Sequence, residues 1–239
     1  MAGVSLSTHY YALVLGVATT RLCEAFRDFL IDIESQGFPV GKPDPDLDAS
    51  VPGRYRALAQ TIDRRFDLFY RLEPLGLVVV GERDLQAAFG AASTHADAVI
   101  GRVESDHTMT SAGELGQIVW PVVKQAISGV LDRAMRDLAA AAAGGRLACG
   151  IEAAARMAGS GRPATLLVED GYHVRGHLGG TAGSPIITPD VGVMDTLDDA
   201  VDVLIEMVLG SGGNVVFTPR GSLRDRQRMA LIIGDKEST

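Results

Sequence analysis

Four arginines stand within nine positions near the end of the chain, in the stretch PRGSLRDRQR. They are Arg220, Arg224, Arg226 and Arg228. An arginine side chain can bridge phosphate oxygens with two hydrogen bonds, and such contacts make binding strongly dependent on salt. Because the stretch follows a strand that Pro219 closes, we expect a surface loop with free guanidinium groups. The loop is therefore predicted either to contact RNA phosphates or, as most charge runs do, to be solvated without a partner.

The stretch LGSGGNVVFTP, from Leu209 to Pro219, has three glycines within four residues and resembles a phosphate-binding loop. Apolar residues before it recur at spacings of three and four, which predicts a helix, and the residues after it predict a strand. Phosphate-binding loops have the opposite order, because the anion sits at the N-terminus of a following helix. We therefore expect Gly210, or Gly212 with Gly213, to end the helix in a left-handed conformation and to bind no ligand.

No set of residues has the spacing of a catalytic or metal centre. His173 and His177 are four apart, as zinc ligands on a helix are, but the glycines around them predict a loop. Ser184 lacks the strand–turn–helix context of a hydrolase nucleophile, and Cys149 is expected to be a small packed residue opening a helix. The remaining histidines are scattered singly: His9, His95 and His107. The sequence therefore predicts no catalytic residue, no metal site and no cofactor.

The composition is that of an ordinary globular protein, with 46% of the 239 residues hydrophobic and 22% charged. Cys23 and Cys149 lie far apart among apolar residues, so no disulfide framework is expected and the reducing cytoplasm is the predicted location. No segment has the length of a membrane span or the pattern of a signal peptide. A membrane is therefore not expected as a partner. The net charge of −8 opposes unspecific binding to nucleic acid, so DNA is not expected as a partner either.

Residues 1–143 are predicted to form the first of two domains. The stretch YYALVLGVATTRLCEAFRDFLIDIES predicts three strands in a meander, and LGLVVVGE and AVIGRVE predict two more. Helices are expected at about 54–72, 83–92 and 111–143, the last with a Ser111–Glu114 capping box and a kink or break at Pro121. A meander followed by strands joined through helices fits a ribonuclease-H-like mixed sheet. A metal nuclease on such a sheet needs an acidic residue on the first central strand, and YALVLGVA has none.

Residues 144–239 are predicted to form the second domain, because Gly144 and Gly145 follow a run of alanines and end the long helix. The elements expected next are a helix at 147–158, the strand ATLLVED, a loop to Pro189, a helix at 196–209 and the strands NVVFT and MALIIG. Alternating elements in a segment of this size predict a small α/β/α sandwich.

Several stretches, taken in order, resemble the bacterial members of the archaeo-eukaryotic release-factor superfamily. They are ELGQIVWPVVKQAI, GIEAAARMAGSGRPATLLVEDG, DDAVDVLIEMVLGSGGNVVFTP and MALIIG, and YYALVLGVATTRLCEA resembles the strand pair at the head of the family's middle domain. The resemblance covers about residues 10–234. It implies a ribonuclease-H-like middle domain followed by a C-terminal domain of the kink-turn-RNA-binding ribosomal-protein type, and it implies work at the ribosome.

Release by that superfamily requires a Gly-Gly-Gln loop, and no Gly-Gly-Gln occurs in this sequence. The prediction is therefore a non-catalytic, translation-associated factor that binds the ribosome or ribosomal RNA, in rescue, in a release-like step or in hibernation. The alternatives are a hydrolase with a site in the groove between the domains and an oligomeric scaffold for protein interactions; the oligomeric state is left open. The RNA contact is expected at Arg220, Arg224, Arg226 and Arg228, or failing those at Arg146, Arg156 and Arg162.

Overall fold

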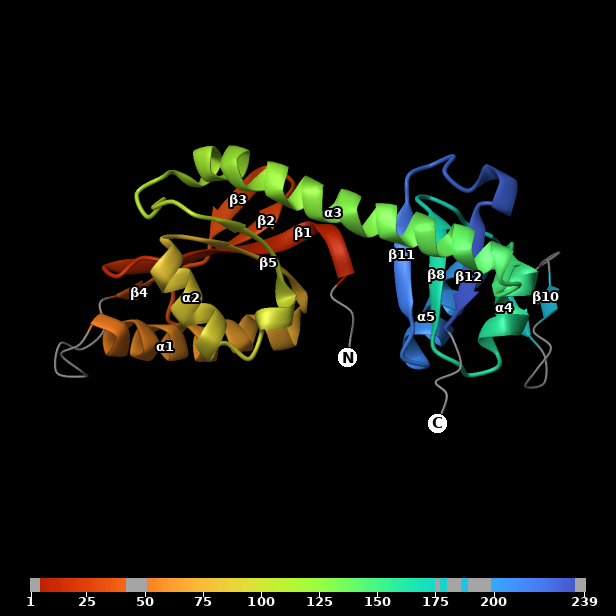
Figure 1. Ribbon diagram of the computed structural model, residues 1–239, viewed down its shortest axis with the longest axis horizontal. Helices are drawn as coiled ribbons and strands as arrows, with labels where there is room; N and C mark the ends of the chain where they lie inside the picture. Colours follow the sequence, from red (N-terminus) through yellow and green to blue (C-terminus); the bar gives the residue numbers. More distant parts are fainter. Residues whose placement is uncertain (1–4, 42–50, 175–176, 180–185, 189–198, 235–239) are drawn as a thin grey trace, which may run out of the picture. The chain divides into compact units, whose positions relative to one another are not determined.

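The computed structural model describes residues 5–41, 51–174, 177–179, 186–188 and 199–234 and shows a mixed α/β protein (Figure 1). The chain divides into two compact units, an N-terminal unit of residues 4–130 and a C-terminal unit that begins at Leu131. This division falls inside helix α3 (Ala112–Ala143), whereas the sequence placed the domain boundary after that helix. The predicted α/β class with mixed sheets is confirmed. That the chain forms two separately stable domains, which meet between residues 143 and 144, stays a prediction.

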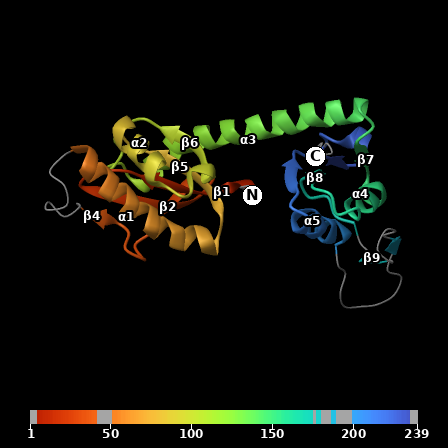
Figure 2. The same ribbon diagram turned by 60° about the horizontal axis from the view of Figure 1, so that its bottom comes forward.

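The N-terminal unit is built on one mixed sheet (Figure 2). Its strands are β1 (Ser5–Val14), β2 (Thr19–Phe26), β3 (Phe29–Asp32), β4 (Val40–Gly41), β5 (Leu75–Val80) and β6 (Val99–Val103). Strands β1, β2 and β3 pair antiparallel in the predicted meander, and β5 and β6 continue the sheet parallel to β1, in the order β3-β2-β1-β5-β6. The short β4 pairs with β2. The structure contains the predicted meander and the parallel strands that follow it. The assignment of this sheet to the ribonuclease-H-like fold stays a prediction.

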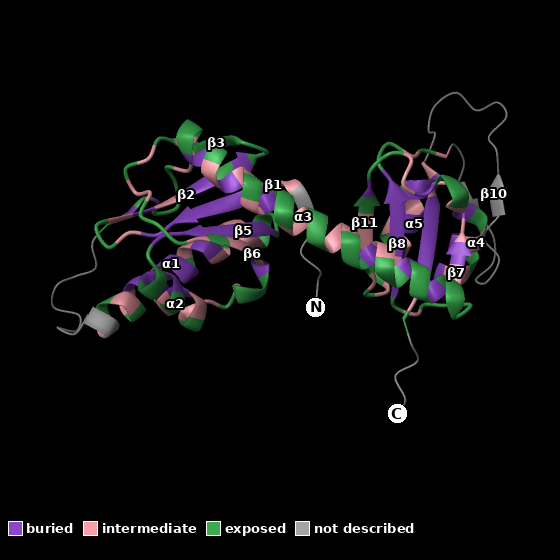
Figure 3. Cartoon of the chain, turned by 45° about the horizontal axis from the view of Figure 1, so that its top comes forward, coloured by how far each residue is buried: buried purple, intermediate pink, exposed green. Residues whose placement is uncertain are grey.

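Helices cover both faces of this sheet. Successive side chains of a strand point to opposite faces, so one strand contributes to two hydrophobic cores. Tyr11 and Leu13 of β1 share a core with Phe66 of α1 (Val51–Leu72), and α2 (Arg83–Ala92) joins the same core. On the opposite face, Tyr10 of β1 shares a core with Val119 of α3. The central strands are consequently buried on both sides (Figure 3).

The C-terminal unit has a second sheet of four strands, in the order β11-β8-β12-β7. The elements of this unit are β7 (Leu147–Cys149), α4 (Ile151–Ala158), β8 (Ala164–Glu169), α5 (Ala200–Gly210), β11 (Asn214–Thr218) and β12 (Met229–Ile233). Helices α4 and α5 pack on one face, where Ala154 and Leu204 meet Leu166. The last turns of α3 pack on the other face, where Leu138 shares a core with Leu167. None of the helices in the described part of the chain is long and apolar enough to cross a membrane.

Two readings of the C-terminal unit need correction. Residues 147–149 form the edge strand β7 and not the first turn of a helix, and α4 begins only after Gly150. A three-residue strand is too short to show a period of its own, so the sequence merged it with the helix that follows. The stretch predicted as a loop to Pro189 contains a small antiparallel pair, β9 (His177–Gly179) and β10 (Ile186–Thr188). Glycines on either side of these short strands masked the signal.

Helix α3 begins and ends where the sequence predicts. The Ser111 hydroxyl donates to Glu114 Oε2 at 2.8 Å, and the Glu114 amide donates to Ser111 Oγ at 3.4 Å, which is the predicted capping box. The helix runs through Pro121 without the break that the sequence allowed. Val119 and Val123 on either side of the proline are fully buried against the sheet, so tertiary packing holds the helix at this point.

The glycine-rich turn after α5 has the structural role that the element order predicts. Gly212 lies at φ 75°, in the left-handed region, and its amide donates to the Leu209 carbonyl. The Gly213 amide donates to the Val208 carbonyl at 2.9 Å, which closes the helix end. A Cβ on Gly213 would lie 2.3 Å from the Ala164 carbonyl oxygen, so the chain passes too close to β8 for any side chain. The Gly212 and Gly213 amides are thus both hydrogen-bonded to carbonyls at the carboxyl end of α5.

Candidate functional site

The four predicted arginines lie in the connection between β11 and β12, which we call the arginine loop (residues 219–228). Leu223 is fully buried and anchors the middle of the loop in the core beneath it. The amides of Arg226 and Arg228 both donate to the Leu223 carbonyl at 2.9 Å, and Arg224–Arg226 forms a short 3-10 turn, η2. The loop is therefore a folded structure with a buried anchor, and its arginines have defined positions.

Glu169, the last residue of β8, holds this loop from below. Its side chain is 2% exposed and accepts the Leu223 amide at 2.7 Å and the Arg228 Nε at 3.1 Å. Burial alone would raise the pKa of Glu169, but the backbone N–H groups of Gly221 and Leu223 and the Arg228 guanidinium outweigh it and lower the pKa. Glu169 is therefore an ionised carboxylate at neutral pH, with hydrogen bonds that fix the turn of the loop.

Two contacts hold the Arg228 side chain. Its Nε bonds Glu169, and its guanidinium carbon lies 4.7 Å from the centre of the Tyr172 ring. Gln227 and Arg228 both lie in the left-handed region, at φ 57° and 65°, which non-glycine residues rarely adopt. Two such residues in succession store backbone strain that the surrounding contacts must hold. Arg228 therefore points back over Glu169 and is not free in solvent.

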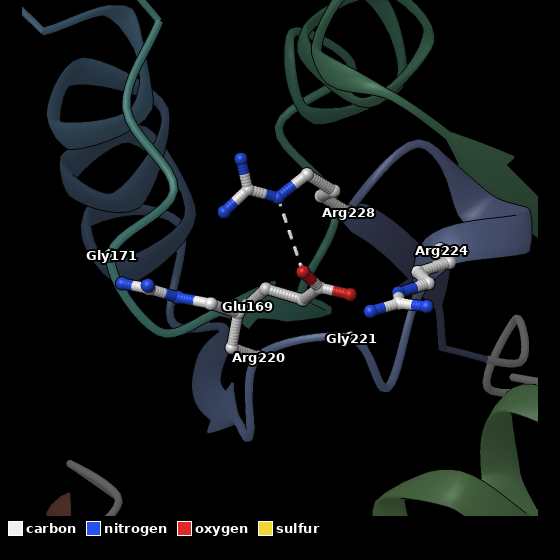
Figure 4. Close-up of a pocket in the computed structure, with 6 residues that line it drawn as sticks. All are labelled: Glu169, Gly171, Arg220, Gly221, Arg224 and Arg228. Atoms are coloured by element: carbon white, nitrogen blue, oxygen red, sulfur yellow. Dashed lines mark hydrogen bonds and ion pairs between the residues drawn. The ribbon is translucent and has the colours of Figure 1, made fainter.

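A cavity of about 390 Å³ opens above these contacts (Figure 4). Its lining residues are Glu169, Gly171, Arg220, Gly221, Arg224 and Arg228. Figure 4 shows the guanidinium groups of Arg220, Arg224 and Arg228 on different sides of the Glu169 carboxylate. Arg220 and Arg224 are exposed, and within the described residues neither has an ion pair or a side-chain hydrogen bond. We call this feature the arginine cavity.

The structure brings three of the four predicted arginines together and separates the fourth. Arg226 does not line the cavity, and its Nε lies 3.3 Å from the carboxylate of its neighbour Asp225. Sequence reasoning did not find Glu169 and Tyr172, the two residues that position Arg228. The one available signal was an acidic residue at the end of the apolar run TLLVE, where a buried strand closes.

The arginines named as second choice lie elsewhere in the C-terminal unit. Arg156 is exposed on α4, and Arg162 donates to the Gly234 carbonyl at 2.8 Å. Arg146 precedes β7, and its carbonyl accepts the Ile233 amide. None of the three lines the arginine cavity.

The histidines have structural partners wherever their side chains are described. His95 Nε2 lies 3.0 Å from Asp67, and His173 Nδ1 lies 2.5 Å from Asp199, the residue that caps α5. His107 bonds Ser105 and Thr110. The His177 side chain and Ser184 lie outside the described residues. The absence of a helix under His173 agrees with the predicted loop.

One group of metal-ligating atoms comes together that the sequence left apart. His9 on β1 lies 2.8 Å from Glu24 on β2 and 3.3 Å from Glu73, the residue after α1. The ligating atoms of the three residues all lie within 4.8 Å of one another. Both glutamates are about half exposed, at 52% and 50%, and exposed acidic groups commonly gather in this way without a metal ion.

Both the sequence and the fold of this chain are similar to those of known proteins. The sequence profile of bacterial archaeo-eukaryotic release factor family 3 matches residues 9–162, more than half of the chain. A solved structure of S. cerevisiae Dom34, described as a translation termination-like factor involved in RNA quality control and interacting with Hbs1, superposes with a TM-score of 0.57 at 12% identity. The match covers 94% of this chain and 62% of Dom34. A second structure of Dom34 gives a TM-score of 0.52 at 14% identity, over 96% of this chain and 64% of Dom34.

These likenesses differ in what they establish. At such low identity the Dom34 structures show a shared fold alone, and this chain spans less than two thirds of their length. None of the curated protein sequences matches the chain significantly. The family match rests on the sequence itself and confirms the predicted resemblance.

Proposed function

Because the chain belongs to bacterial archaeo-eukaryotic release factor family 3, we propose that it is a translation-associated factor that binds the ribosome. Family membership is the observation that carries this proposal, since release factors act on the ribosome. The fold shared with Dom34, itself described as a translation termination-like factor, supports the same class of function. The proposed location is accordingly the cytoplasm. We propose that the first domain has a ribonuclease-H-like fold and that the second has the fold of the kink-turn-RNA-binding ribosomal proteins.

The proposed contact with ribosomal RNA is the arginine loop. All four predicted arginines lie in it, and Arg220 and Arg224 are exposed without an ionic partner among the described residues. The whole chain has a net charge of −8, so a local concentration of arginine is needed to attract a polyanion. The acidic remainder of the surface would then restrict the orientations in which the chain approaches RNA.

The proposed role is binding without peptidyl-tRNA hydrolysis by this chain's own residues. The superfamily's release reaction depends on a Gly-Gly-Gln loop, and the three Gly-Gly pairs of this sequence are followed by Arg146, Thr181 and Asn214. Rescue of stalled ribosomes, a release-like step in which another factor acts on the peptide, and occupation of idle ribosomes are all consistent with binding alone.

Co-sedimentation of the purified chain with purified bacterial ribosomes over a salt series tests the proposal. We expect the wild-type chain to pellet with ribosomes at low salt and the double variant Arg220→Gln/Arg224→Gln to bind more weakly. Each lost phosphate contact should lower the slope of log affinity against log salt by about 0.7–0.9, so two should lower it by about 1.5.

The matched control is Arg133→Gln/Arg136→Gln, which removes the same charge from exposed positions on α3 in the same unit. It should bind like the wild-type chain. Failure of the wild-type chain to pellet at any salt concentration would overturn ribosome binding, and equal losses in both double variants would overturn the assignment to the arginine loop.

A further inference from the structure

The arginine cavity has an excess of positive charge. Its lining holds three guanidinium groups and one carboxylate, a net charge of +2 when Glu169 is ionised. The carboxylate is already engaged by Arg228 and by backbone amides, so it does not neutralise Arg220 or Arg224. A concave site with uncompensated positive charge attracts a small anionic group.

The positive charges in the cavity differ in how firmly they are placed. Arg228 is fixed by Glu169 and by Tyr172. Arg220 and Arg224 are long, exposed side chains whose guanidinium groups lie against the backbone of Gly171 and Gly221. The cavity thus combines one positive charge that contacts within the protein hold in place with two exposed positive charges. A charge that is held in place before binding lowers the entropic cost of binding.

The lining also restricts the class of anion. All six lining residues are arginine, glycine or glutamate, so the side chains that can bind a ligand in the cavity are all charged. The arginine fork matches phosphate oxygens bidentately, and a phosphate monoester carries a charge of about −1.5 to −2 near neutral pH. A charge of this size complements the net +2 of the lining.

We propose that the arginine cavity is a phosphate-binding site in which Arg220 and Arg224 contact the phosphate and Arg228 is a positioned positive charge. Arg226, although it lies in the same loop, takes no part, because it faces Asp225 outside the cavity. The proposal names the chemical group that the proposed ribosome-binding factor recognises, and it rests on that function for RNA as the biological source of the phosphate.

Three probes distinguish the sources of phosphate: adenosine 5′-monophosphate with adenosine as the uncharged control, inorganic phosphate, and a single-stranded RNA octamer with a 5′-hydroxyl end. Binding is followed through the arginine Nε–Hε resonances of the ¹⁵N-labelled chain, because these signals report directly on the guanidinium groups. Adenosine 5′-monophosphate or inorganic phosphate should shift them if the cavity takes a terminal or free phosphate. Binding of the octamer alone would identify the phosphates of an RNA backbone as the source.

Single variants separate the cavity from general attraction to a basic loop. Arg220→Gln and Arg224→Gln should each weaken binding of the active probe by about 10-fold or more, the usual effect of losing a charge-assisted contact. Arg226→Gln removes the same charge from the same loop and should change binding by less than about 2-fold. Arg228→Gln is a poor probe, because it leaves the buried Glu169 without its ionic partner.

Two results would overturn the proposal. One is the absence of binding by all three probes, and the other is an equal loss in Arg226→Gln and in the two cavity variants. Ribosome co-sedimentation separates this outcome from failure of the proposed function. Ribosome binding without phosphate binding would contradict the phosphate site and support the proposed function. Phosphate binding without ribosome binding would support the phosphate site and contradict the proposed function.

Discussion

The glycine turn after α5 allows a stability series in which neighbouring positions should respond in opposite directions. Gly210, Gly212 and Gly213 lie within four residues, and they differ in backbone conformation or in the space around an added Cβ. Gly210 is the last residue of the helix, with nothing within 4 Å of an added Cβ. Its change to alanine should stabilise the C-terminal unit by about 0.5–1 kcal/mol through helix propensity.

Gly212→Ala should destabilise moderately. The added Cβ meets no atom within 4 Å, so the cost is conformational only, from the φ of 75°. An L-residue in the left-handed region costs about 1–2 kcal/mol, and the less flexible unfolded chain offsets about 0.4–1 kcal/mol of this. The net loss should be about 1 kcal/mol, or about 4–8 °C in melting temperature for a unit of roughly 100 residues.

Gly213→Ala should destabilise most, although its backbone conformation is ordinary. The added Cβ would lie 2.3 Å from the Ala164 carbonyl oxygen, 2.8 Å from Val208 Cγ1 and 2.9 Å from the Val208 carbonyl oxygen. Two of these are backbone atoms of β8 and α5, so relief requires movement of whole elements. We expect a loss of about 3 kcal/mol, at the upper end for overpacking.

Urea unfolding followed by circular dichroism measures the series. We expect the free energy of unfolding to fall in the order Gly210→Ala, wild type, Gly212→Ala and Gly213→Ala. Phosphate binding should be unchanged in the folded Gly212→Ala variant. A Gly213→Ala variant that keeps wild-type stability would refute the close-approach reasoning. Loss of phosphate binding at unchanged stability in Gly212→Ala would show that the turn binds the ligand.

Three further outcomes follow from the structure. Glu169→Gln should lower the melting temperature at neutral pH by several degrees, and the difference from wild type should narrow below pH 4.5, because a carboxyl with a lowered pKa loses its stabilising contribution as it protonates. In the native chain a disulfide reagent should modify Cys149 on the order of 100 times faster than Cys23, whose burial raises its pKa to about 12; equal rates would contradict this. Asp63→Ala should cost about 2–3 kcal/mol in urea unfolding, because the buried carboxylate accepts three hydrogen bonds from Ser93 and Thr94; a loss below about 0.5 kcal/mol would contradict it.

The sequence predicted those features that depend on neighbouring residues. Alternation of apolar side chains was enough to place the meander, and the capping residues of α3 marked its start. The three-residue strands β7, β9 and β10 of the C-terminal unit were missed, because pairing with another strand decides whether three residues form a strand. Residues 147–149 are a strand only because β12 lies beside them.

The sequence predicted the cluster of arginines at the candidate site but not the cavity that three of them line. Four arginines in nine positions were visible, whereas their division into three that line a cavity and one outside it depends on the turn around Leu223. Glu169 bonds residues 54 and 59 positions further along the chain, and no local pattern records contacts of that range. The left-handed backbone of Gln227 and Arg228 is equally invisible in sequence, because neither residue is a glycine or an asparagine.

Sedimentation of the chain in a cell lysate tests ribosome binding most directly. The lysate of a strain that carries a tagged chromosomal copy is separated on a sucrose gradient at low salt, beside a strain with the Arg220→Gln/Arg224→Gln variant. We expect the wild-type chain to migrate with ribosomes or a ribosomal subunit and the variant to shift toward the top of the gradient. A wild-type chain that stays at the top, even after cross-linking in the intact cell, would contradict the proposed function.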